Sequence, residues 1–320
     1  MLFILFLIAG FVSLIFGANI LVESASALAK RFNIPNIVIG LTIVAFGTSS
    51  PELLINVFAA VEGNSQIAMG NVIGSNIFNV FGILGISALI YPLAVKSNTT
   101  WIEIPLSFLA ALIVLVLAND LIIDKLGISS ITRIDGIILL FFFVIFLVYT
   151  ILLAKKGEDT GETMQIKKMP LWKSILLIIA GLALLVIGGR SIVYSAVEIA
   201  RHFQISERII ALTIISIGTS LPELATSAVA AYKKNSDIAI GNIVGSNIFN
   251  VFLILGISSV INPVPLMPEA NFDLLVHIAS AFLLFLIIFT GKKHQMDRWE
   301  GGVFLSLYIA YVVALIVGVF

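Results

Sequence analysis

The second half of the chain repeats the first half at a constant offset of 171 residues. The match places 10–92 on 181–263 without a gap. Of the 24 positions in 64–87, 19 are identical to the corresponding positions in 235–258. The polar residues repeat best, whereas a duplication kept only for packing would repeat apolar faces and let the polar details drift. Two copies of one folding unit are therefore expected.

Long apolar runs fill both copies. Of the 320 residues, 60% are hydrophobic and only 11% are charged, against about a quarter in a soluble domain. A helix needs about 20 apolar residues to cross a bilayer, and these runs are too long for the alternating strands of a membrane barrel. The expected spans are 2–29, 35–61, 66–92, 101–119, 132–154, 172–200, 206–232, 237–262, 271–290 and 298–319. The sequence predicts an all-α protein embedded in a lipid bilayer.

Each copy contains five expected spans. Because five is odd, the second copy enters the membrane from the opposite side. The predicted fold is therefore ten transmembrane helices in two inverted five-helix repeats, 1–154 and 172–320, joined by a polar linker at 155–171. Many secondary transporters are built on this plan.

The basic residues of the loops predict the orientation. One set of alternate loops holds 13 Lys and Arg residues and the other set holds four, and the richer set marks the cytoplasm. Both termini are then extracellular, in the cell membrane, and the linker is cytoplasmic. Arg190 remains inside the sixth span, where we expect it to reach toward an interface or to pair with Glu198.

Composition argues against several function classes. The formal net charge is zero, so nothing attracts the chain to nucleic acid. The absence of Cys excludes disulfides, iron–sulfur clusters and zinc–thiolate sites. The sequence has no nucleotide-binding loop, nucleophile motif or catalytic triad, so an enzyme is not expected. The oligomeric state stays open, and a monomer is compatible with the pattern.

A proline motif at 47–52 lies in the middle of the second span and recurs at 218–223. Pro51 has no N–H, so the carbonyl of Gly47 loses its helical partner, and Ser50 is pushed away from helical angles. Such a break survives at membrane depth only where it is buried in protein or lines a cavity. The oxygens that it frees are ligands that Na⁺ and Ca²⁺ prefer.

Glu52 and Glu223 occupy the same position in the two copies of this motif. An unpaired ionised carboxylate at the bilayer centre costs at least ~2.5 kcal/mol, and neither motif contains Lys or Arg. Two carboxylates carry the charge that one Ca²⁺ neutralises. We therefore interpret the pair as a site for a transported cation. The alternative is a pair of protonated glutamates that hydrogen-bond helices together.

A second motif, Gly-Asn-x-x-Gly-Ser-Asn-Ile-Phe-Asn, opens the third span at 70–79 and recurs at 241–250. Its serine and its last asparagine lie four residues apart, on one helix face. If the third helix packs on the second, these oxygens complete the cage. For Asn76 and Asn247, hydrogen bonding without ligation is the alternative. The oxygen ligands expected from this motif are Ser75, Asn79, Ser246 and Asn250.

The doubled motifs resemble the α-repeats of the calcium/cation antiporter superfamily, and the nearest branch looks like the prokaryotic sodium/calcium exchangers. The resemblance covers essentially the whole chain. It implies that broken helices 2, 3, 7 and 8 surround a cation site at mid-membrane, and that helices 1 and 6 slide against this core. It also implies Na⁺ and Ca²⁺ as substrates bound at the central site, with no cofactor.

The resemblance implies a ligand for each ion, residue by residue. The implied Ca²⁺ ligands are Glu52, Glu223 and the backbone carbonyls of Thr48 and Thr219. The implied Na⁺ ligands are Ser49, Ser75, Ser220 and Ser246, with the backbone of Ala45 and Ser216. Asn79 and Asn250 would line the centre. Some members, including potassium-dependent ones, have Asp at the position of Asn250, so Asn there argues against a potassium requirement. Proton-coupled members usually have an acidic residue shortly after the Gly-Asn of the second motif, where this chain has Ile73 and Gly74, and this difference favours sodium coupling.

The sequence thus predicts a secondary active antiporter that exchanges Na⁺ for Ca²⁺ by alternating access. An exchange of three Na⁺ for one Ca²⁺, as the family suggests, would make calcium export electrogenic. Two alternatives remain open, which are an H⁺/Ca²⁺ antiporter of the same fold and a passive cation channel.

Overall fold

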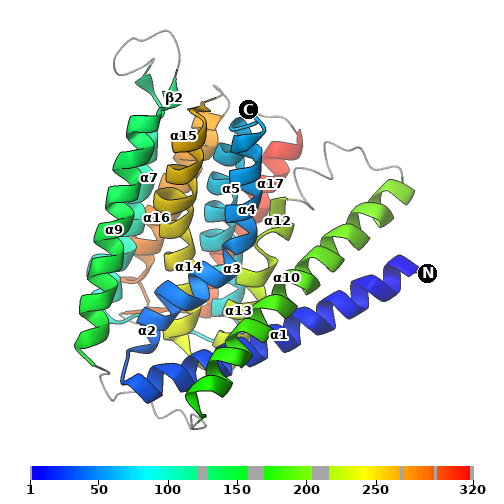
Figure 1. The fold of residues 1–320 in the computed structure, drawn as a ribbon, viewed down its shortest axis with the longest axis vertical. Coiled ribbons are helices and arrows are strands. Elements are labelled where there is room, and N and C mark those ends of the chain that lie inside the picture. Colours follow the sequence, from blue (N-terminus) through cyan, green and yellow to red (C-terminus); the bar gives the residue numbers. More distant parts are fainter. Residues whose placement is uncertain are drawn as a thin grey trace.

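The computed structural model of the protein describes residues 2–120, 129–157, 169–203, 216–266, 270–291 and 294–317, and helices make up most of them (Figure 1). In the first half the helices are α1 (Leu2–Phe32), α2 (Asn36–Ile39), the π-helix η1 (Gly40–Val44), α3 (Ala45–Thr48), α4 (Ser50–Val61), α5 (Gln66–Ile77), the π-helix η2 (Phe78–Leu84), α6 (Gly85–Ile90), the π-helix η3 (Thr99–Glu103), α7 (Ile104–Leu117) and α9 (Arg133–Lys155). In the second half they are α10 (Leu171–His202), α12 (Ser216–Gly218), α13 (Leu221–Tyr232), α14 (Ser236–Ile248), the π-helix η5 (Phe249–Leu255), α15 (Gly256–Ile261), α16 (Ala270–Ile287) and α17 (Arg298–Val317).

Eight described helices are long and apolar enough to cross a membrane, and a bent helix pair, 36–48 with 50–61, makes a ninth candidate. Each of these lies on one of the ten predicted spans. The predicted seventh span falls partly outside the described residues, and its described part is α12 and α13. The chain is therefore a mostly helical membrane protein.

The third and eighth spans were expected to be broken, and this expectation is wrong. Each continues as one helix, over 67–90 and 236–261, and contains a π-helical stretch in its second half. The physical reason is that neither motif contains proline, so no backbone N–H is lost. A π-helical stretch absorbs the distortion by shifting hydrogen bonds to the i→i+5 pattern.

Helices α1 and α10 form a separate pair that lies obliquely against the rest of the bundle (Figure 1). Glycines bring the two backbones into contact: a Cβ added to Gly10 would lie 3.0 Å from the carbonyl of Gly188, and one added to Gly17 would lie 2.9 Å from that of Gly181. Gly181 and Gly188 are the repeat counterparts of Gly10 and Gly17. The pair is thus packed through equivalent positions of the two halves.

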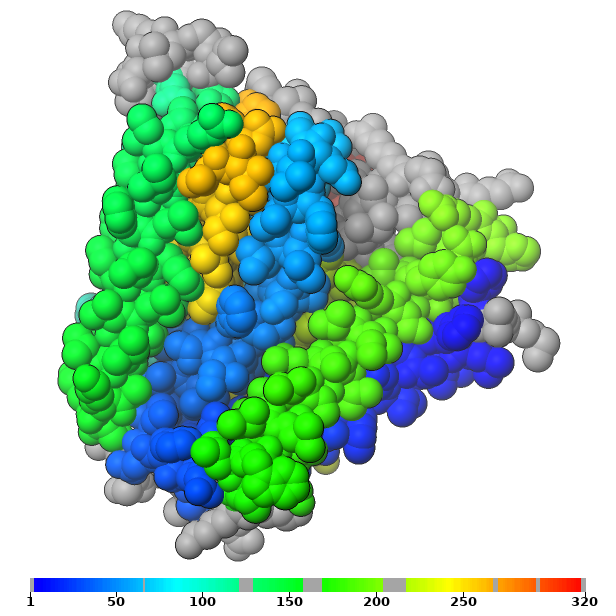
Figure 2. Space-filling model, viewed as in Figure 1, coloured from blue at the N-terminus to red at the C-terminus, as the bar shows by residue number. Residues whose placement is uncertain are grey.

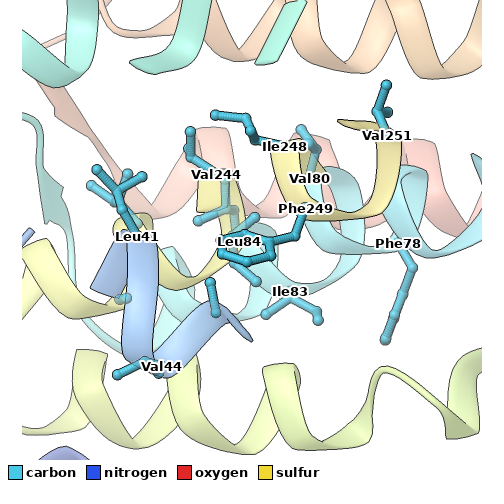
Figure 3. Packing of buried hydrophobic residues seen from close by; sticks show 14 of the residues in the cluster. Leu41, Val44, Phe78, Val80, Ile83, Leu84, Val244, Ile248, Phe249 and Val251 are labelled. Carbon is cyan, nitrogen blue, oxygen red and sulfur yellow. The ribbon is translucent and has the colours of Figure 1, made fainter. Parts of the chain in front are cut away.

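The centre of the bundle is α14, all of whose residues are buried. Around it, side chains of η1, η2 and η5 interdigitate, as the close view of Leu41, Ile83, Val244 and Phe249 shows (Figure 3). The outer face is apolar as well, and Figure 2 shows α9 and α10 on it. Exposed Phe141 on α9 is typical of this lipid-facing surface.

Four strands of two residues each lie in the loops. β1 (Leu93–Ala94) pairs with β4 (Gln295–Met296), and β2 (Ser130–Ile131) pairs with β3 (Val264–Pro265), both antiparallel. Each pair joins a loop of the first half to a loop of the second. The all-helical expectation therefore holds for the spans, while the loops add short pairings that connect the two halves.

Candidate cation-binding site

Two helix breaks position the site. Helix α3 ends at Thr48, Ser49 adopts non-helical angles of φ −82° and ψ 5°, and α4 begins at Ser50 with Pro51 in its first turn. The two segments meet at a bend of 48°. The break lies one residue before the predicted one, because proline fits the first turn of a helix and Ser50 can therefore stay helical.

The second break has the same construction. Helix α12 ends at Gly218, Ser220 has φ −91° and ψ 10°, and Pro222 stands in the first turn of α13. In both halves the glutamate follows the proline directly, so its carboxyl group lies beside the break. The predicted interruption of the second and seventh spans is therefore present in the described residues.

Glu52 and Glu223 are both buried, with 2% and 1% of their surface exposed. The Ser220 hydroxyl donates to Oε1 of Glu52 at 3.2 Å, and the Ser49 hydroxyl donates to Oε1 of Glu223 at 2.9 Å. Each glutamate thus accepts a hydrogen bond from the break of the other half. The two carboxyl groups, 171 positions apart in the repeat, belong to one site.

The serines of the second motif complete this arrangement. The hydroxyl oxygens of Ser49 and Ser246 lie 2.9 Å apart, and those of Ser220 and Ser75 lie 3.1 Å apart. All four side chains are buried. The four serines proposed from the sequence are therefore brought together around the two glutamates.

The central asparagines make a second reciprocal pair of contacts. Nδ2 of Asn79 donates to Oδ1 of Asn247 at 2.9 Å, and Nδ2 of Asn250 donates to Oδ1 of Asn76 at 2.9 Å. The side-chain nitrogen of Asn79 and that of Asn250 thus donate hydrogen bonds, while the side-chain oxygens of both residues accept none from the described residues. Hydrogen bonding, the alternative for Asn76 and Asn247, is what these two side chains do here.

Four carboxylate and amide oxygens of the predicted ligands are buried and have no hydrogen-bond partner among the described residues, although buried polar atoms are normally paired. They are Oε2 of Glu52, Oε2 of Glu223, Oδ1 of Asn79 and Oδ1 of Asn250. Among the described residues no Lys, Arg or His forms an ion pair with either glutamate. A set of unpaired oxygens without a resident counter-charge is suited to hard cations such as Na⁺ and Ca²⁺.

The remaining predicted ligands lie at the edges of the breaks. Oγ1 of buried Thr48 contacts Oδ1 of Asn242 at 3.1 Å and donates to the Ala45 carbonyl at 3.3 Å. Ala45 also accepts from the backbone N–H of Ser49 at 2.9 Å. Oγ1 of Thr219 is buried and has no partner in the described part of the chain. Ser216 begins α12.

Sequence reasoning missed the asparagines that hold the glutamates. Nδ2 of Asn56 donates to the carbonyl of Glu52 at 2.7 Å, and Nδ2 of Asn242 donates to that of Glu223 at 3.3 Å. Asn242 could have been found from the sequence, because it recurs as Asn71 in the Gly-Asn pair of the other half. Asn56 could not, because the equivalent residue of the second half is Ser227.

Arg190 does not pair with Glu198, which instead accepts from Arg201 at 3.0 Å. Arg190 lines a cavity of about 270 Å³ beside both breaks, together with Pro51, Gly218, Thr219 and Pro222. The long side chain is exposed and has no ion-pair partner among the residues that the structure describes. The guanidinium group therefore places a positive charge close to both helix breaks.

The chain resembles known proteins along most of its length. The family described as "Sodium/calcium exchanger protein" matches residues 2–152 and 173–317, which includes both breaks and both glutamates. The chain belongs to the sodium/calcium exchanger family. The family match also covers both helices of the α1–α10 pair.

Relatives in the sodium/calcium exchanger family match along almost their full length. The sodium/calcium exchanger MaX1 of Methanosarcina acetivorans is 31% identical over 342 residues, covering 97% of each chain. The inner membrane protein YrbG of Escherichia coli is 34% identical over 325 residues, covering 97% of this chain and 95% of YrbG. A solved structure of the sodium-calcium exchanger NCX_Mj superposes with a TM-score of 0.82 at 31% identity, covering 98% and 99% of the two chains. Cation antiport is therefore the function of the family to which the chain belongs.

Proposed function

We propose that this protein is a secondary antiporter that exchanges Na⁺ for Ca²⁺ at the site formed by Glu52 and Glu223. The observation that carries the proposal is the set of four unpaired buried oxygens, two from carboxylates and two from amides. Two carboxylates supply a charge of −2 when ionised, which one Ca²⁺ neutralises. Several Na⁺ ions neutralise the same charge when they use the surrounding serine hydroxyls.

Competition between the two loads couples their fluxes. Because the oxygens of Glu52 and Glu223 serve both ions, full occupation by Ca²⁺ excludes full occupation by Na⁺. Either load offsets the buried charge and lets the protein change the side to which the site opens. An empty site retains a charge that is costly to occlude in a low-dielectric interior. The empty site therefore does not cross to the other side of the membrane, so that ions move only in exchange for one another.

The moving part in this proposal is the α1–α10 pair. Leu182 of α10 faces Gly47 at the first break, and a Cβ added to Gly47 would lie 2.5 Å from the leucine side chain. Val193 of α10 faces Gly218 at the second break, and a Cβ added to Gly218 would lie 2.2 Å from the valine side chain. At both breaks a glycine thus leaves room for a side chain of α10. A shift of α10 along the bundle would change the surroundings of both glutamates together.

Ten helices in two inverted repeats, with both termini extracellular, form the topology of this proposal. The observed spans and the reciprocal contacts support two equivalent halves, and the charge bias of the loops supports the orientation. If three Na⁺ move for each Ca²⁺, one net charge crosses per cycle. A membrane potential then contributes ~2.3 kcal/mol per 100 mV to calcium export from a negative cell.

The test is ⁴⁵Ca²⁺ uptake into liposomes that contain the purified protein. Loading the liposomes with Na⁺ and diluting them into Na⁺-free buffer should drive uptake, and an imposed pH gradient without Na⁺ should not. Uptake that follows the pH gradient and ignores Na⁺ would establish the proton-coupled alternative. Calcium flux that needs no opposing ion would establish a channel.

A further inference from the structure

A buried histidine stands next to the site and has no part in the proposed exchange. His277 lies in α16, a span whose other central residues are apolar or small, and it is 1% exposed. All three histidines of the chain lie in its second half. Nε2 of His277 lies 3.2 Å from Nδ2 of Asn76, a residue of the central asparagine cluster. The histidine is therefore a feature of one half only.

The orientation of Asn76 follows from a backbone group. Nδ2 of Asn76 lies 3.3 Å from the carbonyl oxygen of Asn247, which can only accept a hydrogen bond. The amide nitrogen of Asn76 must therefore face both Asn247 and His277. This assigns Nε2 of His277 as an acceptor and places the ring proton on Nδ1, which is buried and has no partner among the described residues.

The same chain of bonds decides which end of Asn250 is free. Because the nitrogen of Asn76 faces His277, its oxygen faces away and accepts from Nδ2 of Asn250 at 2.9 Å. The oxygen of Asn250 is left buried and without a partner in the described residues. A reversed Asn250 would present hydrogen atoms instead of an oxygen, and an amide NH₂ cannot bind a cation.

We infer that His277 is a positioning residue, which acts through Asn76 to keep the amide oxygen of Asn250 available as a ligand for the transported cation. The inference rests on the proposed function, since it takes Asn250 as a ligand. The role is positional, because the ring of His277 contacts Asn76 and, within the described part of the chain, forms no hydrogen bond with a glutamate or serine of the site. It acts through an acceptor atom and not through a charge.

The other half provides an internal comparison. Oδ1 of Asn247 accepts from Nδ2 of Asn79 at 2.9 Å, but Nδ2 of Asn247 has no partner in the described part of the chain. Asn79 is therefore oriented by a partner that is itself less firmly held, and Asn250 is the better defined of the two amide ligands.

Variants of His277 separate an acceptor role from simple packing. His277→Leu removes the acceptor and leaves an apolar side chain. His277→Gln keeps an acceptor oxygen that can face Asn76. Ser280→Ala is a matched control, because Ser280 is buried one turn away in α16 and its hydroxyl donates only to the carbonyl of His277 in its own helix.

The measurement is the KM for Ca²⁺ and the maximal rate in Na⁺-loaded liposomes. Loss of one hydrogen bond corresponds to roughly a fivefold change in an equilibrium constant, so His277→Leu should raise the KM about fivefold with little change in maximal rate. His277→Gln should stay within about twofold of the wild type, as should Ser280→Ala.

Three results would overturn the inference: an unchanged KM in His277→Leu, an equal rise in KM in the Leu and Gln variants, or a loss of maximal rate and folded protein in both at constant KM. The last would assign His277 to packing alone. A wild-type protein that takes up no Ca²⁺ would overturn the proposed function itself, so the two failures are distinguishable.

Discussion

The hydroxyl of Ser49 donates a hydrogen bond to Glu223 across 2.9 Å, although the residues are 174 positions apart in the chain. The symmetric contact, from Ser220 to Glu52, measures 3.2 Å. Each helix break therefore holds the carboxyl group of the opposite break. A displacement of either break must change the surroundings of both carboxylates.

These contacts predict that the serines matter more for Na⁺ binding than for Ca²⁺ binding. In Ser49→Ala we expect the Na⁺ concentration for half-maximal exchange to rise about tenfold, because an oxygen ligand and a hydrogen bond to a carboxylate are lost together. The KM for Ca²⁺ should change less, because both carboxylates remain. The measurement is ⁴⁵Ca²⁺ uptake at a series of internal Na⁺ concentrations.

Ser50→Ala is the matched control for this prediction. Ser50 is the next residue, and its hydroxyl donates to the carbonyl of Phe46 in the same span, at 2.8 Å. Its removal should leave both ion dependences unchanged within about twofold. A larger Na⁺ effect in the Ser50 variant than in Ser49→Ala would contradict the assigned roles.

The sequence was sufficient to predict much of this site, because the repeat marks equivalent positions directly. Proline and glutamate in both copies predicted the breaks and the carboxylates, and the structure brings Glu52 and Glu223 into contact with the predicted serines. Contacts between different motifs were not predictable. The contact between Asn76 and His277 joins residues 201 positions apart, and only one of them lies in the repeat motif.

Helix continuity was the least predictable feature, because glycine in the third and eighth spans permits distortion without requiring a break. Gly82 is replaced by Leu253 in the second half, yet both spans contain a π-helical stretch. The distortion therefore does not depend on Gly82.

A second prediction concerns the moving helix. A Cβ at Gly218 would lie 2.2 Å from Cγ2 of Val193 in α10, so Gly218→Ala should hinder a shift of α10 past the break. We expect the maximal exchange rate to fall at least tenfold while Ca²⁺ binding to the purified protein is kept within a few-fold. The binding and the flux of the same preparation should be compared.

Gly70→Ala is the control for this comparison, since a Cβ at Gly70 would meet nothing within 4 Å. It should transport like the wild type. Equal rates for Gly218→Ala and the wild type would show that α10 does not move against the second break during exchange.

A third prediction concerns Arg190, whose side chain lines the cavity beside Thr219 and both prolines. A fixed positive charge there opposes the approach of cations. Arg190→Asn, which restores the residue found at Asn19 in the first half, should lower the KM for Ca²⁺ about two- to threefold at low ionic strength. The difference should shrink in high salt with a non-transported cation.

Lys173→Gln is a suitable control, because Lys173 is an exposed cation in the first turn of the same helix, far along the sequence from the cavity. It should not change the KM. A higher KM in Arg190→Asn would mean that the guanidinium assists cation entry, and would contradict the proposed repulsion.

A fourth prediction follows from the free oxygen of Asn250. Asn250→Asp adds a carboxylate, so that one Ca²⁺ no longer neutralises the site when all three acids are ionised. We expect tighter Ca²⁺ binding and slower release, seen as a lower KM together with a lower maximal rate. Asn79→Asp is the matched variant of the other half and should act in the same direction. A raised KM in both would argue against amide oxygens as ligands.

The central claim, that Glu52 and Glu223 share one calcium ion, is tested most directly by Ca²⁺ titration of the purified protein in a calorimeter. We expect one Ca²⁺ bound per wild-type chain in Na⁺-free buffer, and no measurable binding in either Glu52→Gln or Glu223→Gln, with both variants folded as the wild type. Full Ca²⁺ binding by either single variant would contradict it.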